Sequence, residues 1–555
     1  MSSQSSCPEH LQAQMIIIIH PGSLNLRIGR ASDFNPIRII HAIGRKIRPN
    51  GHQYRDRILP QVSKESLAEF EEHRLQVSHI IQSCSQSDGR RRYATPPQQI
   101  AAFNRRSTPD IIGKAETNTL RKETIIGDEI MNINVNDPYN IHFPIKRGEL
   151  NLHSELGGSL TSVMTDLQDI WEHVLKAKMG IDLSILNQYK AVLVIPDIYN
   201  RSHLKELTSL LLNRMGFGSC FLVQDHVSAT FGAGLGHACV VDVGDQKTSI
   251  SCVEDGISQP NTRVRLEYGG ADVTQVLHCL LEKCSFPYKE CNDSTLKDVF
   301  LLKQLKEKCC HVNLDICGSQ EKTFEVCHGE NKLKYTIQVG DECIVAPLSL
   351  FHTELLTITG KSKAAKVQIS ASHQPDSEDC FDAEYIRETS RRNAREQLDQ
   401  IQGDGVIVQQ DNQEEELVVD SFENERDSKN DKDFVLPNGQ VIGIDQAVLL
   451  SIERCPNEEM KKKMYGCVLV VGGGMKFAGI GKWLQNKMAL NVAYSHRSEH
   501  LDIVTSTKDM DPAMTAWKGA AIMSCLESAP ELWINQHEWQ KYGLRILREK
   551  APFMW

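Results

Sequence analysis

The first regular pattern in the chain is a short apolar run that is broken by a turn. In residues 16–30, IIIIHPGSLNLRIGR, four isoleucines precede a Pro-Gly-Ser turn, and an alternating apolar and polar stretch follows it. This pattern predicts a β-hairpin. A turn of small residues can hold a phosphate with its backbone amides. His20 then occupies a place where a metal-organising carboxylate would be expected.

From residue 146 onward, apolar positions alternate between strand and helix spacing. This alternation predicts an α/β fold. Helices are expected over 157–180, 201–216, 269–283 and 296–312 and in the region of 444–455. A strand followed by a helix is expected over 219–234, and a buried strand at 190–200.

The hairpin pattern recurs at residues 238–253, ACVVDVGDQKTSISCV. Two such hairpins indicate a duplicated α/β unit in which each copy offers a loop to one phosphate chain from opposite sides. In the second copy, Asp242 and Asp245 flank Gly244, so that carboxylates can orient a hydrated Mg²⁺ while the glycine lets the backbone approach phosphate. Asp and Gly are also frequent in turns for conformational reasons alone, and the motif by itself is weak.

A third glycine-rich stretch lies late in the chain, in LVVGGGMKFAGI at residues 469–480. Gly472, Gly473 and Gly474 follow an apolar strand and are expected to open a helix, where close backbone approach suits a nucleotide. Neither a Walker loop nor a GxGxxG spacing is present, and a tight strand-helix turn alone would explain the glycines equally well. Combined with the two hairpins, they favour a nucleotide site.

Length and composition agree with a protein of several packed subdomains. The chain has 555 residues, of which 40% are apolar and 24% charged, as is usual for globular proteins. We expect no membrane association and an intracellular location, because no signal sequence or apolar stretch of about 20 residues is seen. The 17 cysteines form no CxxC pair, which predicts buried reduced thiols.

Charge is distributed unevenly along the chain. The whole chain has a net charge of −10, and residues 373–433 alone carry −12. The rest of the chain therefore carries +2. The acidic stretch 361–433 loses all periodicity and is predicted to be disordered. Residues 45–125 form a basic, loop-like block with a helix expected near 63–75. This block is either a solvated insertion or a phosphate-backbone or nuclear-import patch, whose candidate DNA contacts are Lys46, Arg48, Arg90, Arg91 and Arg92.

Together with the hairpins, three further stretches resemble the actin superfamily: YGGADVTQVL at 268–277, LKQLKEKCCHV at 302–312 and AWKGAAIMSCLESAPELWINQHEWQKYG at 516–543. The resemblance covers most of residues 15–45, 125–360 and 434–555. It implies an actin-like fold of two related lobes around a nucleotide cleft. The expected organisation is a flexible N-terminus at 1–14, a first lobe at 15–240 interrupted by the basic insertion 45–125, a second lobe at 241–500 interrupted by the acidic insertion 361–433, and a C-terminal segment 501–555 that returns to the first lobe.

The resemblance also implies ATP, with Mg²⁺, as the ligand. Arg27 would replace a phosphate-binding lysine, and Asp242 would serve the metal. The other implied nucleotide contacts are Gly22, Ser23 and Leu24 in the first turn, Val243, Gly244 and Asp245 in the second, Gly270 near the sugar, Lys306 and Glu307 at the adenine, and Gly472, Gly473 and Gly474.

Three positions bear on hydrolysis. The resemblance assigns Gln224 to the positioning of the attacking water, whereas His20 stands in place of a carboxylate and Ser249 in place of a histidine. Phosphate cradling needs amides, and hydrolysis needs a well-placed metal and water. We therefore expect nucleotide binding with at most very weak hydrolysis.

Further stretches, such as VIPDIYNRSHLKEL at 194–207 and KDMDPAMTAWKGA at 508–520, are similar to a subfamily of subunits of the inositol-requiring (Ino-eighty) chromatin-remodelling complex. This likeness implies a nuclear protein that binds the motor subunit through its helicase-SANT-associated helix, beside nuclear actin and another actin-related protein. Nucleosomes, histones or linker DNA would be further partners, with roles in transcription, replication and DNA repair. The alternatives are a genuine ATPase or phosphotransferase and a filament-forming actin, and filaments are not expected because the insertions alter contact surfaces.

Overall fold

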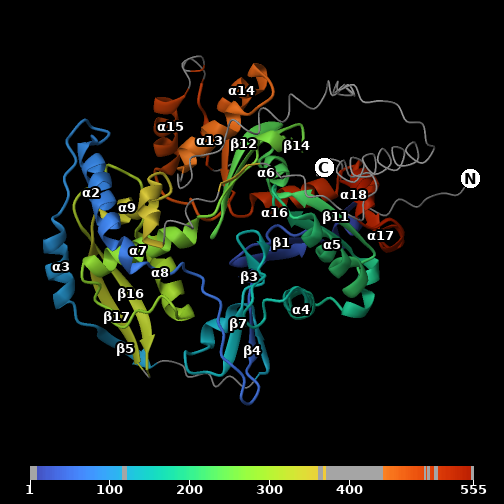
Figure 1. The fold of residues 1–555 in the computed structure, drawn as a ribbon, viewed down its shortest axis with the longest axis horizontal. Coiled ribbons are helices and arrows are strands. Elements are labelled where there is room, and N and C mark those ends of the chain that lie inside the picture. Colours follow the sequence, from blue (N-terminus) through green and yellow to red (C-terminus); the bar gives the residue numbers. More distant parts are fainter. Residues whose placement is uncertain are drawn as a thin grey trace, which may run out of the picture. The chain divides into compact units, whose positions relative to one another are not determined.

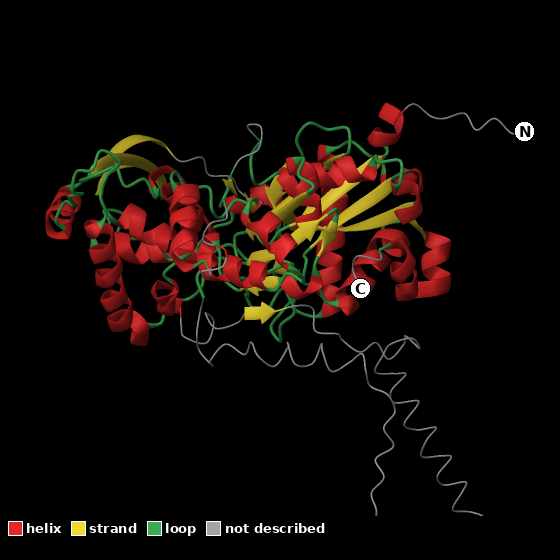
Figure 2. Ribbon diagram, turned by 90° about the horizontal axis from the view of Figure 1, so that it is seen from above, coloured by secondary structure: helices red, strands yellow, loops and turns green. Residues whose placement is uncertain are grey.

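The structure is a computed structural model that describes residues 9–114, 122–329, 331–359, 367–369, 442–492, 496, 500–505 and 510–551. Its strands form a six-stranded and a seven-stranded sheet with smaller sheets beside them (Figure 1). Helices lie on both sides of the strands (Figure 2). The predicted α/β fold is confirmed.

The first sheet has the order β21-β11-β10-β1-β2-β3. Strands β1, β10 and β11 are parallel, and β1 and β2 form the predicted hairpin. Strand β21 comes from the C-terminal part of the chain and pairs with β11. The strands are β1 (Ile16–Pro21), β2 (Asn25–Arg30), β3 (Ile37–Ile40), β10 (Lys190–Ile195), β11 (Ser219–Gln224) and β21 (Ile534–Asn535).

The second sheet has the order β18-β15-β13-β12-β19-β20, with β14 paired to β13. Its β12–β13 pair is the second predicted hairpin, and β19 runs parallel to β12. The strands are β12 (His237–Val243), β13 (Thr248–Glu254), β14 (Ile257–Ser258), β15 (Val264–Leu266), β18 (Val367–Ile369), β19 (Val468–Val471) and β20 (Ile503–Val504).

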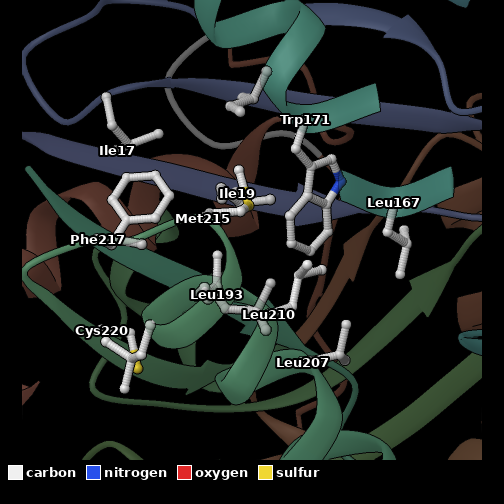
Figure 3. Close-up of a cluster of buried hydrophobic side chains, with 14 of the residues drawn as sticks. Ile17, Ile19, Leu167, Trp171, Leu193, Leu207, Leu210, Met215, Phe217 and Cys220 are labelled. Carbon is white, nitrogen blue, oxygen red and sulfur yellow. The ribbon is translucent and has the colours of Figure 1, made fainter. Parts of the chain in front are cut away.

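The isoleucine run has a simple explanation in the burial of the first sheet. Alternate side chains of a strand point to opposite faces, and both faces of β1 are covered. Ile17 and Ile19 pack with Trp171 and Phe217 in one core (Figure 3), whereas Ile16 and Ile18 belong to a second core. Each such buried side chain contributes roughly 1.5–3 kcal/mol, so this strand anchors the hairpin that follows it.

The first of these cores includes residues of four helices: α4 (Leu160–His173), α5 (Arg201–Ser209), α17 (Gln536–Tyr542) and α18 (Ile546–Lys550). The second core includes residues of α6 (Asp225–Ala233) and α16 (Thr515–Ser524) together with strands of both sheets. These two helices therefore lie between the sheets.

Helices α6 and α16 touch backbone to backbone. A Cβ on Gly232 would lie 2.1 Å from the Thr515 carbonyl oxygen, and one on Gly519 would lie 1.6 Å from the Ser228 carbonyl oxygen. Only glycine permits this approach. The two helices thus cross at a contact that excludes any side chain.

Residues 47–123, which we name the bridging segment, leave β4 (Ile43–Lys46) and return to β6 (Thr124–Ile126). Both strands belong to a small sheet with β7 (Tyr139–His142). Between them lie α2 (Leu67–Ser83), α3 (Pro97–Arg106) and β5 (Asp110–Lys114). In Figure 1 these blue elements lie beside α9 (Glu342–Leu348) and the sheet formed by β16 (Gln320–His328) and β17 (Asn331–Val339).

The bridging segment is held by specific polar contacts. The Arg92 guanidinium binds the Asp341 carboxylate at 2.7 and 3.0 Å. The Asn104 amide donates to the carbonyl oxygens of Cys284 and Gln338 at 2.9 and 3.0 Å. This block is therefore not wholly loop-like: the predicted helix near 63–75 is part of α2, and α3 was missed. Arg92 is only 1% exposed in its side chain, which removes it from the candidate DNA contacts.

Other expectations were wrong in detail. Residues 9–14 of the predicted flexible N-terminus form α1 (Glu9–Gln14), and residues 367–369 of the predicted disordered stretch form β18, which pairs with β15. The rest of the acidic stretch 361–433 lies outside the described residues. Every cysteine within the described ranges is a free thiol. No helix in these ranges is both long and apolar enough to span a membrane.

The remaining elements complete the walls around the sheets. They are β8 (Ile145–Lys146), β9 (Glu149–Leu150), α7 (Gly270–Lys283), α8 (Leu296–Cys309), α13 (Ile444–Glu453), α14 (Glu458–Tyr465) and α15 (Ile480–Asn491). The helices predicted over 269–283 and 296–312 and near 444–455 are confirmed as α7, α8 and α13, whereas α14 was not predicted.

Candidate nucleotide site

The turns of both hairpins line one cavity of about 380 Å³. The same cavity is lined by the ends of β10 and β19, by the N-terminus of α7 and by one face of α8. Thirteen of the fourteen residues that the sequence assigned to a nucleotide lie on its wall: Gly22, Ser23, Leu24, Arg27, Asp242, Gly244, Asp245, Gly270, Lys306, Glu307, Gly472, Gly473 and Gly474. Val243 does not reach it and is fully buried.

The first turn is tight because of a backbone hydrogen bond. The Gly22 amide donates to the Asn25 carbonyl oxygen at 3.0 Å, and a Cβ on Gly22 would lie 2.7 Å from that oxygen. From behind, the His41 ring contacts the Gly22 carbonyl oxygen through Nδ1 at 2.8 Å. Burial lowers the pKa of His41 to about 4, although this hydrogen bond opposes the shift. The imidazole that supports the turn is therefore neutral at pH 7.

His20 and Arg27 lie directly opposite each other on β1 and β2. Burial, reinforced by the charges of Arg27 and Lys247, lowers the pKa of His20 well below its ordinary value. His20 is consequently neutral and supplies no negative charge for a metal. The Nε of Arg27 and the Nδ1 of His20 are both buried without a hydrogen-bond partner. An unpartnered buried guanidinium nitrogen is costly, and an anion in the cavity would satisfy it.

The second turn keeps its carboxylates. Asp242 is the last residue but one of β12 and lines the cavity. Burial raises its pKa and Asp225 adds to the shift, while Lys247, His226 and Arg27 oppose it. The Asp245 carboxylate forms an ion pair with Lys303 of α8. Asp242 is thus the buried carboxylate best placed among the predicted residues to face a cation bound with phosphate.

Glycine backbones form the floor between the second turn and its neighbours. The Gly270 amide donates to the Gly244 carbonyl oxygen at 3.0 Å, and the Gly474 amide donates to the Val243 carbonyl oxygen at 2.7 Å. A Cβ on Gly474 would lie 2.3 Å from the Gly244 oxygen, and Gly472 has a φ of +89°. These glycines are required because two chain segments approach through their backbones. They do not open a helix as predicted, because α15 begins only at Ile480.

Helix α8 contributes the side chains at the other end of the cavity. The Lys306 ammonium donates to the Gly270 carbonyl oxygen at 2.7 Å. Burial and the nearby Lys303 lower the pKa of Lys306 to about 8. Lys303 precedes Lys306 by one helical turn and lines the cavity as well. Its helical spacing from Lys306 and Glu307 was the signal by which the sequence could have identified it.

The residue at the β11–α6 junction differs from the prediction. Gln224 is fully buried and its amide points to the Asp197 carbonyl oxygen at 3.4 Å, whereas the next residue, Asp225, lines the cavity. The assignment of Gln224 to an attacking water is therefore wrong. The chain places a carboxylate at this point of the cavity.

Behind Asp225 lies a buried polar network that the sequence did not reveal. The His226 ring contacts Ser251 Oγ at 2.7 Å and Asp197 at 3.1 Å through Nδ1, and Ser249 Oγ at 3.0 Å through Nε2. Burial would lower the pKa of His226, but the carboxylates of Asp197 and Asp225 outweigh it and raise the pKa. Asp197, Asp225 and His226 lie close enough to hold a metal. Most of their polar atoms are already engaged with one another, with serines or with Lys247, whereas Asp197 Oδ1 is buried without a partner.

The site fits a nucleoside triphosphate. Amides of two turns, a glycine floor and the unpartnered Arg27 Nε suit phosphate. Asp242 is the carboxylate that would serve a divalent cation accompanying it. Gly270, Lys306 and Glu307 stand together at the α7–α8 end, where a nucleoside would lie.

Comparison with known proteins gives this arrangement its family. The model of the actin family matches residues 11–552, and the chain belongs to this family. The cavity that both hairpin turns line is therefore the cleft of an actin fold.

The similar relatives share one name. Actin-related protein 8 of Aedes aegypti is 64% identical and each chain is covered completely. The Drosophila melanogaster protein of that name is 46% identical, with 98% of this chain and 95% of the relative covered. A solved structure described as human actin-related protein Arp8 in its ATP-bound state is 36% identical, covers 99% of both chains and has a TM-score of 0.83. The subfamily likeness that the sequence stretches suggested is thus a likeness to proteins named actin-related protein 8, and membership in a chromatin-remodelling complex stays a prediction.

Proposed function

We propose that the protein is an ATP-binding structural subunit of a nuclear chromatin-remodelling complex. One observation carries the nucleotide part of the proposal: two glycine turns from related hairpins face a single cavity whose far end holds the predicted adenine-side residues. The ATP-bound state in the description of the human relative supports the same ligand. Mg²⁺ would accompany the ATP at Asp242.

ATP would stabilise the protein more than the protein would turn ATP over. A ligand that contacts both hairpins stabilises the folded chain by linkage to binding. Turnover depends on a well-placed metal and water, and the first turn offers the neutral His20 instead of a carboxylate. The protein accordingly acts as a scaffold with at most very weak hydrolysis.

The test is mass spectrometry of the nucleotide released from the purified full-length protein, repeated with Asp242→Ala. We expect ATP from the unaltered protein and a strong loss in the variant. Phosphate release should stay far below about 1 s⁻¹, a rate at the low end of ordinary enzymes. Release at or above that rate, abolished by Asp242→Ala, would instead support the ATPase or phosphotransferase.

The partners follow from the subfamily. The motor subunit would bind through its helicase-SANT-associated helix, with nuclear actin and another actin-related protein beside it, and nucleosomes, histones or linker DNA would be engaged by the assembly. Sedimentation with ATP and Mg²⁺ should give no filaments. Co-purification of the full chain with a peptide of the motor helix and actin, in one complex on gel filtration, checks the assembly.

The proposed contact with DNA would be made by exposed arginines of the bridging segment. Arg90 and Arg91 are exposed, whereas Arg92 is tied to Asp341. A double variant, Arg90→Ala with Arg91→Ala, should weaken DNA binding and reduce its salt dependence, because each phosphate contact releases counterions. A matched Arg92→Ala variant should lower thermal stability without changing the salt dependence. Equal DNA binding by all three proteins would remove this patch as the contact.

A further inference from the structure

Lys247 lies at the end of the second turn and is not among the residues that the sequence assigned to the nucleotide. Its carbonyl oxygen accepts the Gly244 amide at 2.8 Å and so closes the turn. Its aliphatic stem passes Gly148, where a Cβ would lie 3.0 Å from the Lys247 Cδ. Gly148 belongs to the β8–β9 turn and has a φ of +81°. The side chain is thus guided into the cavity between two turns.

The Lys247 ammonium has two partners among the described residues. Nζ lies 3.1 Å from Asp225 Oδ2 and 3.3 Å from Ser249 Oγ, and the side chain is 12% exposed. An ammonium group has three N–H donors. Two are used by these contacts, and one is left for an acceptor in the cavity that Lys247 lines.

Asp225 is held independently of Lys247. Its Oδ1 accepts the backbone amide of His226 at 3.0 Å, and the His226 ring, itself fixed by Asp197, lies 3.9 Å away. The carboxylate is therefore a fixed point to which the lysine is tethered. If Lys247 turns toward an anion, the Asp225 carboxylate keeps its contacts with His226.

Two cations from the two hairpins converge on the same place. Arg27 of the first hairpin, opposite His20, and Lys247 of the second hairpin line the same cavity together with Asp242. Lys303 and Lys306 come from α8 and lie beside Asp245 and Gly270. A nucleotide with its base at α8 would extend its last phosphate toward Arg27 and Lys247.

We propose that Lys247 binds the terminal phosphate of the triphosphate and makes the site prefer ATP over ADP. This inference rests on the proposed nucleotide binding. In this arrangement the first two phosphates would lie at the glycine floor, and the charge of Lys247 would contribute to binding only when a third phosphate is present. Asp225 opposes the same phosphate and moderates the preference.

The experiment measures the affinities of nucleotide-stripped full-length protein for ATP and ADP, each with Mg²⁺, by calorimetry. Lys247→Met keeps the length of the stem and removes the charge. ATP affinity should fall by about 10- to 100-fold, as expected for one charge-assisted hydrogen bond, and ADP affinity should stay within about threefold. Lys247→Arg should restore most of the preference. Lys463→Met, at an ion pair on α14 outside the cavity, is the matched control and should change neither affinity.

In Lys247→Met the Asp225 carboxylate loses its lysine partner, and its repulsion of the terminal phosphate could by itself weaken ATP binding. A double variant distinguishes this repulsion from the loss of a direct contact between Lys247 and the phosphate. Asp225→Asn alone should raise the ATP to ADP preference, and Asp225→Asn with Lys247→Met should lose it again. Equal weakening of both nucleotides in Lys247→Met, or no change in either, would overturn the inference. If the unaltered protein binds neither nucleotide, the proposed function itself fails. Melting temperatures without nucleotide show whether each variant is folded.

Discussion

The two glycine hairpins are related in pattern but differ in the charge that surrounds them. Around the first turn stand Arg27 and two histidines, His20 and His41, whose pKa values are lowered. Around the second stand Asp242, Asp245 and a histidine, His226, whose pKa is raised by carboxylates. The first hairpin offers cationic and neutral donors, and the second offers anions balanced by lysines. The duplicated unit has thus divided its tasks: the first suits phosphate, and the second suits both phosphate and its metal.

The largest difference should appear in stability. His226→Ala removes one partner of a buried ion pair and leaves Asp197 with serine hydroxyls and the nearby charge of Arg263 as its remaining support. This change should lower the free energy of unfolding by about 3 kcal/mol, the lower end of the range for breaking a buried ion pair. His41→Ala removes a neutral ring that contacts Gly22 and should cost about 1–3 kcal/mol. Urea unfolding measures both, with the exposed His79→Ala as control. Equal losses in the two hairpins would contradict the division.

Nucleotide binding should depend strongly on the carboxylate of the second hairpin. Asp242→Ala should weaken Mg²⁺-dependent ATP binding by about 100-fold, because a metal held beside phosphate is among the largest local charges of such a site. Calorimetry with and without Mg²⁺ measures the effect. The exposed Asp88→Ala variant should bind ATP normally. An unchanged Mg²⁺ dependence in Asp242→Ala would place the cation elsewhere.

The histidines beside the two hairpins should also make the free energy of unfolding depend on pH in opposite directions. The folded pKa of His41 is about 4, below the ordinary 6.5. Between pH 6.5 and about 4 the unfolded chain therefore binds the extra proton, and stability falls as pH falls. His226 has a raised pKa. Its contribution is complete below pH 6.5 and is lost as pH rises through the raised value.

Unfolding free energies measured from pH 4 to 9 would show these two slopes, each at most roughly 1.4 kcal/mol per pH unit. His41→Asn should flatten the acid side and His226→Gln the alkaline side. If either variant flattened the other side, the assignment of the two histidines would be reversed.

The smallest effect is expected from restoring a carboxylate to the first turn. His20→Asp places a charge beside Arg27 and Lys247 and should raise the Mg²⁺ dependence of ATP affinity about threefold. His20→Asn, similar in size but uncharged, should leave that dependence unchanged. The comparison is made by calorimetry at a series of Mg²⁺ concentrations, and a matching rise in both variants would show that shape rather than charge is responsible.

The sequence was sufficient for what depends on local pattern. Both hairpins, the long amphipathic helices and the glycine positions follow from spacing and from the conformations that only glycine adopts. The bridging segment shows the limit: its helices α2 and α3 carry few apolar residues in a regular period, and their place is decided by partners such as Asp341 that are distant in sequence.

The chemistry behind the second hairpin was equally hidden. Asp197 lies in the loop after β10, His226 in α6 and Ser249 in β13, and nothing in the sequence brings these three residues together. Gln224 and Asp225 illustrate a further limit, because a shift of one residue where β11 becomes α6 decides which side chain enters the cavity. Lys247 was overlooked because one lysine after a turn is usually a solvated residue.

The glycine contact between α6 and α16 is a vulnerable point next to the cavity, because Asp225 of α6 and Ala516 of α16 line that cavity. The chain passes from one sheet to the other through these two helices, and Gly232 and Gly519 let them meet without side chains. A single methyl group at either position would push the two helices apart and change the orientation of the two hairpins relative to each other. Nucleotide retention would then suffer although every ligand contact was intact, so a variant at this point can resemble a defect in the cleft.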